Sequence, residues 1–501
     1  MKLNYKRTIL VGMAFFLISA FWQAYDAIVP LILTNHFGLP QTASGTVMSI
    51  DNILAVFMLP IFGALSDRVC TKLGKRTPFV LVGTIAAVAA FVFLAVVDTW
   101  QINSLYEAGI GQKFDIQQAL LNEAKEALKI AEAAGDQTLI NLHNAQIESI
   151  NAAIDAIRQD ALAHSLNNAG TIIAFIATLL VVLIAMATFR SPAVALMPDV
   201  TVKSLRSKGN AIINLTGTAG GILVLVLGMV FGTSKNLTMN YIGYVLAVVA
   251  VMMLGLIIFM ITVKEKKWAA EMEADTERLA LEEPAPSESE NDVEKRKLSK
   301  PEFTSLMLIL ASVALWYIGY NSITSKYSVY ATNILGFDFN MTLIIAQAAA
   351  IVSYIPVGII ASKVGRRKTI LAGIIMLASA FFIGNFITSN SPEIIMYPVF
   401  ILAGMGWATI NVNSFPMVVE LAKGGDVCKY TGYYYTASMA AQIVAPILSG
   451  VLYDLFGMRV MFFAFGTLFV AFSFITMFFV KHGDAKPLQK KSALESLDVD
   501  D

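Results

Sequence analysis

Four ionisable side chains lie within long apolar stretches of this sequence, where charged groups are costly and usually face a cavity or a partner. They are Asp26, Asp51, Arg190 and Lys326. Burial makes a carboxylate easier to protonate, whereas a nearby cation makes protonation harder. We expect Asp26 to take up and release a proton during function. A permanent structural pair between Asp26 and a neighbour is the alternative.

The depth of each charge follows from the helix rise of about 1.5 Å per residue. Asp26 and Asp51 lie roughly 6–7 Å, and Lys326 roughly 13 Å, to one side of the midplane. An Asp26–Lys326 salt bridge would hold that side of the protein closed, and protonation of Asp26 would weaken it. Arg190 lies roughly 10 Å to the other side of the midplane. Its long side chain either reaches the membrane surface on that side or binds a solute. Asp51 has the simpler alternative of bordering a loop.

Amide and aromatic side chains gather near the centres of the same stretches. A sugar offers hydroxyl groups to amides and an apolar ring face to an aromatic platform. For any one amide, a hydrogen bond between helices is the alternative interpretation, but the set favours a hydrophilic cavity for a small solute. The candidates are Trp22, Gln23, Tyr25, Trp316, Tyr317, Tyr320, Asn321, Trp407, Asn411, Asn413 and Gln442.

The elements that position these residues are membrane spans. Hydrophobic residues make up 56% of the chain and charged residues 14%, against about 25% charged in soluble proteins. Spans need about 20 apolar residues, whereas barrels need short alternating segments. We predict an all-α membrane protein, with a first span that is not a cleaved signal. The twelve runs are 8–34, 44–66, 78–98, 169–197, 207–231, 240–263, 302–333, 340–361, 370–388, 393–420, 431–453 and 458–480.

Basic residues set the expected orientation. Twenty lie in the termini and short loops of one side and two, Lys235 and Arg459, in the short loops of the other. The basic side faces the cytoplasm, so we expect a plasma-membrane protein with both termini inside. Cys70 and Cys428 fall on that reducing side, and two cysteines do not make a disulfide framework.

The chain divides into two repeating halves. The loop GALSDRVCTKLGKR, residues 63–76, has a counterpart GIIASKVGRRK at 358–368 in the same orientation, which indicates a parallel repeat. We predict a six-helix bundle over 1–263, a mobile cytoplasmic linker over 264–300, a second bundle over 301–481 and a cytoplasmic tail over 482–501. The linker is rich in Glu, Lys, Ser and Pro.

These loops resemble the signature of the major facilitator superfamily. The inserted Cys70-Thr71-Lys72, the following Thr77-Pro78-Phe79, PAVALMPD (192–199) and RSKGNAIINLTGTAGG (206–221) resemble the sucrose-transporter-like and glycoside–pentoside–hexuronide symporter branch. The resemblance implies two six-helix bundles, alternating access and proton-coupled symport of a sugar or glycoside.

Three positions depart from that branch. Val194 stands where plant-type sucrose carriers have an arginine, and Leu59 stands where melibiose-type symporters have an aspartate before the helix-2 proline. The melibiose-type sodium site is therefore not reproduced. In the second-half loop, Ser362 replaces the signature aspartate.

The first-half loop is expected to gate the cytoplasmic side. Asp67 accepts hydrogen bonds from Arg68 or Arg76, or lies at a helix N-terminus of the other half. The alternative is that its basic residues only anchor the loop to anionic lipid. The gating candidates are Gly63, Asp67, Arg68, Gly74, Lys75 and Arg76.

Residues 99–168 form an insertion with nine acidic and four basic side chains. Isoleucines at 147, 150, 154 and 157 recur at helical spacing, and Gly135-Asp136 is a turn signal. We predict an extracellular helical hairpin. It acts as a cap, as a docking surface for an extracellular partner, or as an insertion without a transport role.

The sequence contains no nucleotide-binding loop, metal cluster or nucleophile–base array, so we expect no enzyme activity, cofactor, metal site or nucleic-acid partner. We predict a monomer that binds a small-molecule substrate within the lipid bilayer. The alternatives are an efflux carrier for amphipathic compounds and a receptor or sensor that does not transport.

Overall fold

The computed structural model describes residues 3–202, 205–282, 299–421 and 427–482. Within them, twelve helices are long and apolar enough to cross a membrane, which confirms the predicted fold class. The predicted tail, beyond His482, lies outside the described residues.

The N-half contains six spans, a helical hairpin and a terminal helix. α1 packs on α7, and α3 packs on α6. The helices are α1 (Tyr5–Leu31) with the π-turn η1 (Ile32–His36), α2 (Gln41–Arg68), α3 (Thr77–Glu107), α4 (Ile110–Ala134), α5 (Gln137–Asn167), α6 (Ala169–Asp199), α7 (Arg206–Phe231), α8 (Ile242–Thr262) and α9 (Glu265–Glu282).

The C-half repeats the arrangement without a hairpin. α10 packs on α16, and α13 packs on α14. The helices are α10 (Lys300–Thr324), α11 (Tyr327–Val329), the π-turn η4 (Tyr330–Leu335), α12 (Phe339–Val364), α13 (Arg366–Gly384), the short η5 (Glu393–Ile395), α14 (Met396–Val419), α15 (Val427–Phe456) and α16 (Met458–Phe478). The predicted seventh run, 302–333, is therefore broken after Thr324.

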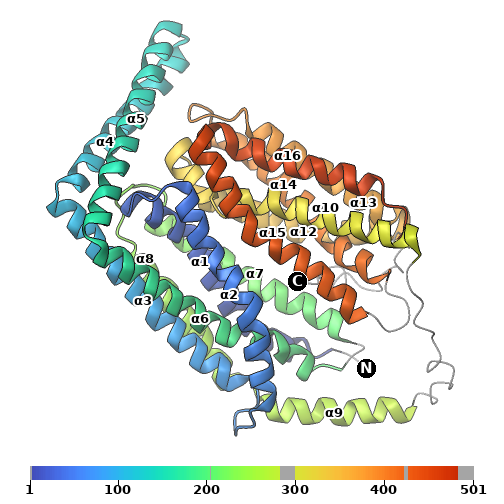
Figure 1. Ribbon diagram of the computed structural model, residues 1–501. Helices are drawn as coiled ribbons and strands as arrows, with labels where there is room; N and C mark the ends of the chain where they lie inside the picture. The colour runs from blue at the N-terminus through green and yellow to red at the C-terminus, as the bar shows by residue number, and fades with distance from the viewer. Residues whose placement is uncertain (1–2, 203–204, 283–298, 422–426, 483–501) are drawn as a thin grey trace.

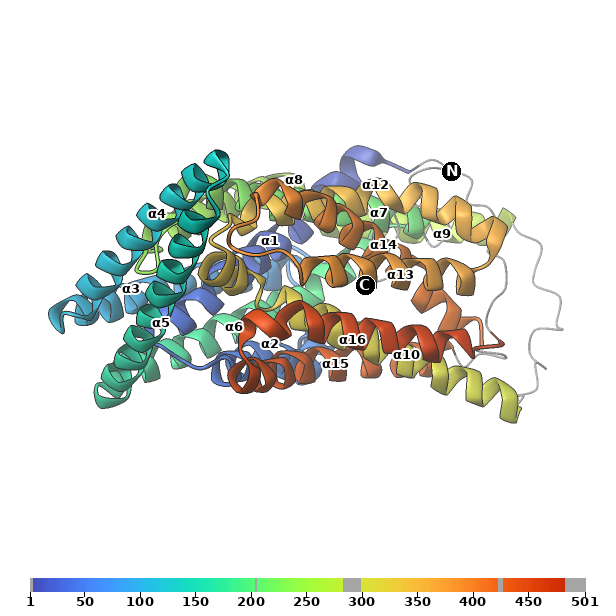
Figure 2. The same cartoon turned by 90° about the horizontal axis from the view of Figure 1, so that it is seen from above.

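The halves meet along two helix pairs, α2 with α15 and α7 with α12. Each pair joins one helix of each half. A two-fold pseudo-symmetry axis between the halves relates one pair to the other. Figure 1 shows the N-half and C-half side by side, and Figure 2 shows the same bundle from above.

α4 and α5 form the predicted hairpin. Gly135 adopts φ +69° at the turn, and the Asp136 carboxylate accepts hydrogen bonds from the first amides of α5. Leu121, Leu128, Ile147 and other apolar side chains form a separate core between the two helices. The hairpin projects from one end of the bundle, here called the hairpin end (Figure 1).

α9 lies crosswise at the opposite end, here called the termini end (Figure 1). This helix corrects the prediction of an unstructured segment directly after the sixth span. Arg7 holds it in place, since its guanidinium pairs with Glu271 and lies 4.8 Å from the ring centre of Trp268. The rest of the predicted linker, 283–298, lies outside the described residues.

Candidate functional site

The two acidic candidates of the N-half come together in the middle of the bundle. The Asp26 carboxylate of α1 interacts electrostatically with that of Asp51 on α2. The Asp26 side chain is exposed to solvent although protein surrounds it. It therefore faces a water-accessible recess between the helices rather than a packed core.

Arg190 of α6 joins this acidic pair. Its charge interacts with Asp51, and its guanidinium lies 5.6 Å from the ring centre of Trp22. The Trp22 and Tyr25 rings lie edge to face at 5.4 Å. Neither the Trp22 Nε1 atom nor the Tyr25 hydroxyl has a hydrogen-bond partner among the described residues. Both groups are buried, so a solute reaches them only when the surrounding side chains move.

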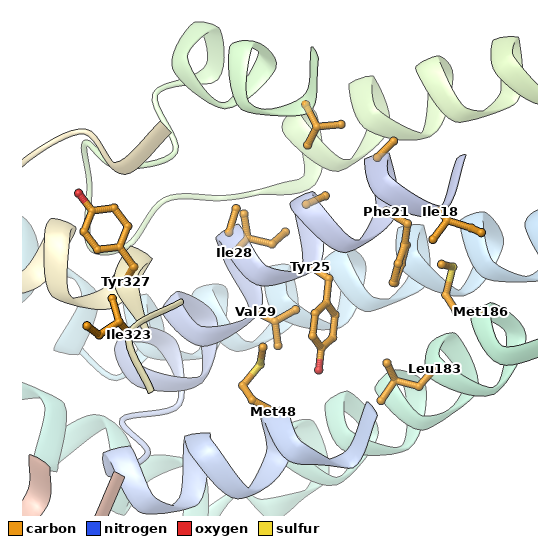
Figure 3. Packing of buried hydrophobic residues seen from close by; sticks show 14 of the residues in the cluster. Ile18, Phe21, Tyr25, Ile28, Val29, Met48, Leu183, Met186, Ile323 and Tyr327 are labelled. Atoms are coloured by element: carbon orange, nitrogen blue, oxygen red, sulfur yellow. The ribbon is translucent and has the colours of Figure 1, made fainter. Parts of the chain in front are cut away.

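Packing against α2 and α6 directs Tyr25 into this cluster. Figure 3 shows its hydroxyl pointing from α1 into the space between Met48 of α2 and Leu183 of α6. The ring is fully buried and belongs to the core of the bundle. The polar end of an otherwise apolar side chain thus reaches the acidic pair.

The C-half contributes an aromatic platform. The Tyr320 and Trp407 rings stack nearly parallel, with centroids 3.7 Å apart, and Tyr317 meets Trp407 edge to face at 5.3 Å. Tyr320 interacts electrostatically with Asp26. The platform therefore borders the recess from the other half, as a ring-binding surface for a sugar would.

A second contact between the halves lies beside the recess. Gln347 Nε2 of α12 donates to Gln23 Oε1 of α1 at 2.7 Å. Gln347 is half-buried and extends the amide lining that the sequence suggested. Gln347 was not among the sequence candidates, although it is an amide within the eighth apolar run.

Two of the other substrate-binding candidates bond to their own helices. Asn321 Nδ2 donates to the Tyr317 carbonyl, and Asn413 Nδ2 donates to the Thr409 carbonyl, each one turn away. Asn411 is buried and Gln442 is half-buried. Trp316 is fully buried in the core. These contacts fit the alternative in which amides stabilise helices.

Lys326 requires a correction, because it belongs to a gate and not to the Asp26 cluster. Lys326 Nζ donates to the Gln41 carbonyl at 3.2 Å and interacts with Asp454. The Asp454 carboxylate accepts from the backbone amides of Gln41 and Thr42 at 2.8 and 2.7 Å, and from Thr42 Oγ1 at 2.6 Å. Asp454 of α15 therefore caps α2 across the interface between the halves.

Matching asparagines close the same end. Asn35 and Asn333 exchange hydrogen bonds at 3.2 and 2.9 Å. They occupy equivalent places in the π-turns η1 and η4, each within a Thr-Asn-x-x-Gly motif whose glycine has positive φ. This short repeat was visible in the sequence and would have indicated a contact on the pseudo-symmetry axis.

α2 and α15 also approach closely at the hairpin end. A Cβ atom on Gly45 would collide with the Pro446 carbonyl. Ser49 Oγ donates to the Ile443 carbonyl at 2.9 Å. These contacts, with the Asp454 cap and the asparagine pair, close the hairpin end in this conformation.

The signature loop forms a network centred on the buried Arg76. Its guanidinium donates to Asp199 at 2.8 Å and to Asp67, Ser66 and the Gly63 carbonyl. Burial alone would lower the pKa of Arg76. Hydrogen bonds and attraction from Asp199 and Asp67 outweigh burial and raise that pKa above its ordinary value.

Glu265 of α9 holds the backbone of this loop. Its carboxylate accepts from the amides of Lys75, Arg76 and Thr77 at 2.6–2.9 Å, and so caps α3. Gly74, at φ +123°, leaves room for that carboxylate, which a Cβ atom would strike. Arg68 is exposed. Glu265 was not among the sequence candidates, because the Glu- and Lys-rich segment that contains it predicted a linker.

The C-half repeats one part of this network. Arg366, at the start of α13, pairs with Glu420, at the end of α14. The equivalent N-half pair is Arg76 with Asp199, which joins α3 to α6. Each half thus ties two of its helices together at the termini end.

Fold and site together define a membrane carrier built from two repeated halves around a polar recess. A model of the MFS_1 like family matches residues 11–411, and a model of the Major Facilitator Superfamily matches residues 339–497. The chain belongs to the major facilitator superfamily.

The relatives agree with this assignment. The MFS-type transporter ppzB of Metarhizium rileyi (strain RCEF 4871) is 29% identical over 114 residues, which is 23% of this chain and 23% of that protein. The inward open xylose transporter XylE from E. coli is 12% identical, with 99% of each chain covered and a TM-score of 0.56. A POT family transporter in complex with 5-aminolevulinic acid is 10% identical, with 94% of this chain and 95% of that chain covered and a TM-score of 0.60.

These solved structures show the fold. Because the chain belongs to this superfamily of membrane transporters, it is a membrane transporter and not an enzyme.

Proposed function

We propose that this carrier couples proton movement to symport of a small hydrophilic solute, most simply a sugar or glycoside. The observation that carries the proposal is Asp26, a carboxylate exposed in a recess between aromatic groups of both halves. The named likeness to a D-xylose-proton symporter, at 13% identity and a TM-score of 0.58, supports the substrate class only by analogy.

The proposed cycle uses the cluster as follows. A proton on Asp26 removes its repulsion with Asp51, and Arg190 then balances the remaining negative charge. The solute lies between Trp22 with Tyr25 and the Tyr320–Trp407 platform, where it satisfies the open polar groups. Binding thus depends on both halves, which is what alternating access requires.

This conformation faces the termini end. Since the hairpin end is closed by contacts between α2 and α15, water reaches Asp26 from the other side. The excess of basic residues at the termini end supports a cytoplasmic location for that end. We therefore propose an inward-facing carrier of the plasma membrane with an extracellular hairpin.

The test is uptake into proteoliposomes with an imposed pH gradient. A panel of monosaccharides, disaccharides, glycosides and nucleosides identifies the solute. Asp26→Asn removes proton-driven accumulation and keeps solute exchange at equal concentrations. Asp136→Asn, in the hairpin turn, serves as the matched control and behaves as wild type. Full accumulation by Asp26→Asn, or transport of no panel member, overturns the proposal.

Efflux of amphipathic compounds is the second candidate, because the stacked Tyr320–Trp407 platform also suits flat apolar rings. Release of a preloaded amphipathic dye under the same gradient, without transport of any sugar or glycoside, would support efflux instead.

A further inference from the structure

The hairpin is built as a rigid extension of the N-half. Its core includes Leu237 from the α7–α8 loop. Thr238 Oγ1 donates to Asp115 at 2.9 Å, and Gln101 Nε2 donates to Ser165 Oγ at 2.8 Å. These contacts tie both hairpin helices to the N-half, so the hairpin moves with that half.

The same hairpin contacts the C-half. The side chains of Asn144 on α5 and Asn390 share a hydrogen bond. The Lys125 ammonium lies against Gly336, in the space that a side chain at 336 would occupy. A change in the angle between the halves must therefore break these contacts.

Charge complementarity accompanies the contact. Lys129 interacts electrostatically with Glu393, which lies beside Asp338. Burial lowers the pKa of Lys125, and the neighbouring charge of Lys129 lowers it further. Lys129 thus faces an acidic C-half surface formed by Asp338 and Glu393, and Lys125 lies on the same edge of α4 against Gly336.

The interface is polar and incompletely filled. A cavity of about 370 Å³ separates α5 from the C-half, and its lining includes Asn144, Asn151, Arg158, Asn333 and Asn390. Arg158 Nε also donates to Asn35 at 3.3 Å, so the cavity borders the asparagine pair of the gate. A hydrated polar contact separates at less cost than an apolar core, because water replaces its hydrogen bonds.

We propose that the hairpin is an electrostatic clamp for the hairpin end. Its basic edge docks on the Asp338–Glu393 surface when that end is closed and releases when that end opens. The clamp rests on the proposed alternating access but does not depend on which solute or ion is carried. Its partner is the C-half of the same chain.

The test measures the opening of the hairpin end by electron–electron distance spectroscopy. Spin labels replace the exposed Leu166 and Leu455 in a protein carrying Cys70→Ser and Cys428→Ser. Lys125→Gln with Lys129→Gln raises the ratio of open to closed distances about two- to tenfold, because both changes remove positive charge from the edge of α4 that contacts the C-half. High salt raises the same ratio in the wild type.

Two controls separate the clamp from general destabilisation. Lys113→Gln removes a hairpin charge that pairs with Asp160 within the hairpin, and it leaves the distances unchanged. Glu393→Lys as a single substitution opens the hairpin end. Combining it with Lys129→Glu restores opposite charges across the contact and closes that end again.

A cross-link gives an independent test. An Asn144→Cys, Asn390→Cys disulfide holds the hairpin end closed until a reductant is added. The clamp is wrong if the double lysine variant matches the wild type, or if the cross-linked protein still reaches the open distances. Neither measurement needs a substrate, so failure of the proposed transport function is distinguishable from failure of the clamp.

Discussion

Removing the Asp454 carboxylate opens the hairpin end without changing the central cluster. The first turn of α2 follows Pro40, which provides no side-chain cap, so its amides would lack partners. Asp454 supplies three hydrogen bonds to Gln41 and Thr42 from the other half. Because α2 and α15 belong to different halves, the cap stabilises the closed state and not the open one.

The size of the effect follows from this geometry. Replacing an N-cap aspartate by alanine costs about 0.5–2 kcal/mol, with about 1 kcal/mol typical. Since about 1.4 kcal/mol corresponds to a factor of ten, Asp454→Ala raises the open-to-closed ratio roughly fivefold, within about two- to thirtyfold. The open-to-closed ratio of Asp454→Asn lies between those of the wild type and Asp454→Ala, because an amide has one acceptor oxygen where the carboxylate has two.

Thiol labelling measures the opening. Ser49 is fully buried between α2 and α15, so Ser49→Cys reacts with a membrane-impermeant maleimide only when the hairpin end opens. The labelling rate then follows the open fraction. The background carries Cys70→Ser and Cys428→Ser.

The control removes a comparable helix cap that does not join the halves. Asp136 caps α5 inside the hairpin through Thr138 and Leu139. Asp136→Ala lowers hairpin stability by a similar amount and leaves Ser49→Cys labelling unchanged. Equal labelling rates in the wild type and Asp454→Ala would refute the reasoning, as would an equal increase in both variants.

Four further predictions follow from close contacts at both ends and at the platform. Gly45→Ala places a methyl group against the Pro446 carbonyl, so the same labelling assay shows faster reaction at the hairpin end. Glu265→Gln weakens the α3 cap by about 1 kcal/mol, which hydrogen exchange reports as roughly fivefold faster exchange of the amides that begin α3. Arg76→Lys replaces the guanidinium with a single ammonium, which cannot bond Asp67 and Asp199 together. This variant therefore has a lower melting temperature in detergent. Trp407→Leu keeps an apolar side chain at a half-buried position but loses the stacked ring, so the solute KM rises more than thermal stability falls.

Local sequence predicted most of the fold. Apolar runs of about 20 residues predict the spans. Backbone groups within lipid must pair with one another, so only helices and closed barrels cross a membrane, and a helix needs about 20 residues to do so. The isoleucine spacing and Gly135 likewise indicated the hairpin that the structure contains. The sequence failed at α9, where Trp268 and Glu265 are buried against the N-half. The Glu- and Lys-rich composition of this segment predicted a linker, so those two contacts were not expected.

The site was predicted less completely. Asp26, Asp51, Arg190, Trp22 and Tyr320 were recognised, because each is polar or aromatic within an apolar run and the structure groups them. Their partners were not recognised. Equal depth suggested an Asp26–Lys326 pair, but depth along a helix does not specify the direction in which a side chain points.

The sequence by itself determined the number of spans, because lipid requires each span to be a run of about 20 apolar residues. It also showed the repeat and the charges within those runs. Only the tertiary structure decided that Lys326 and Asp454 form a gate, that Glu265 caps α3 and that Lys129 faces Glu393. Those pairings depend on the rotation and crossing of helices far apart in the chain. Such rotation is set by packing between whole surfaces, which one segment does not encode.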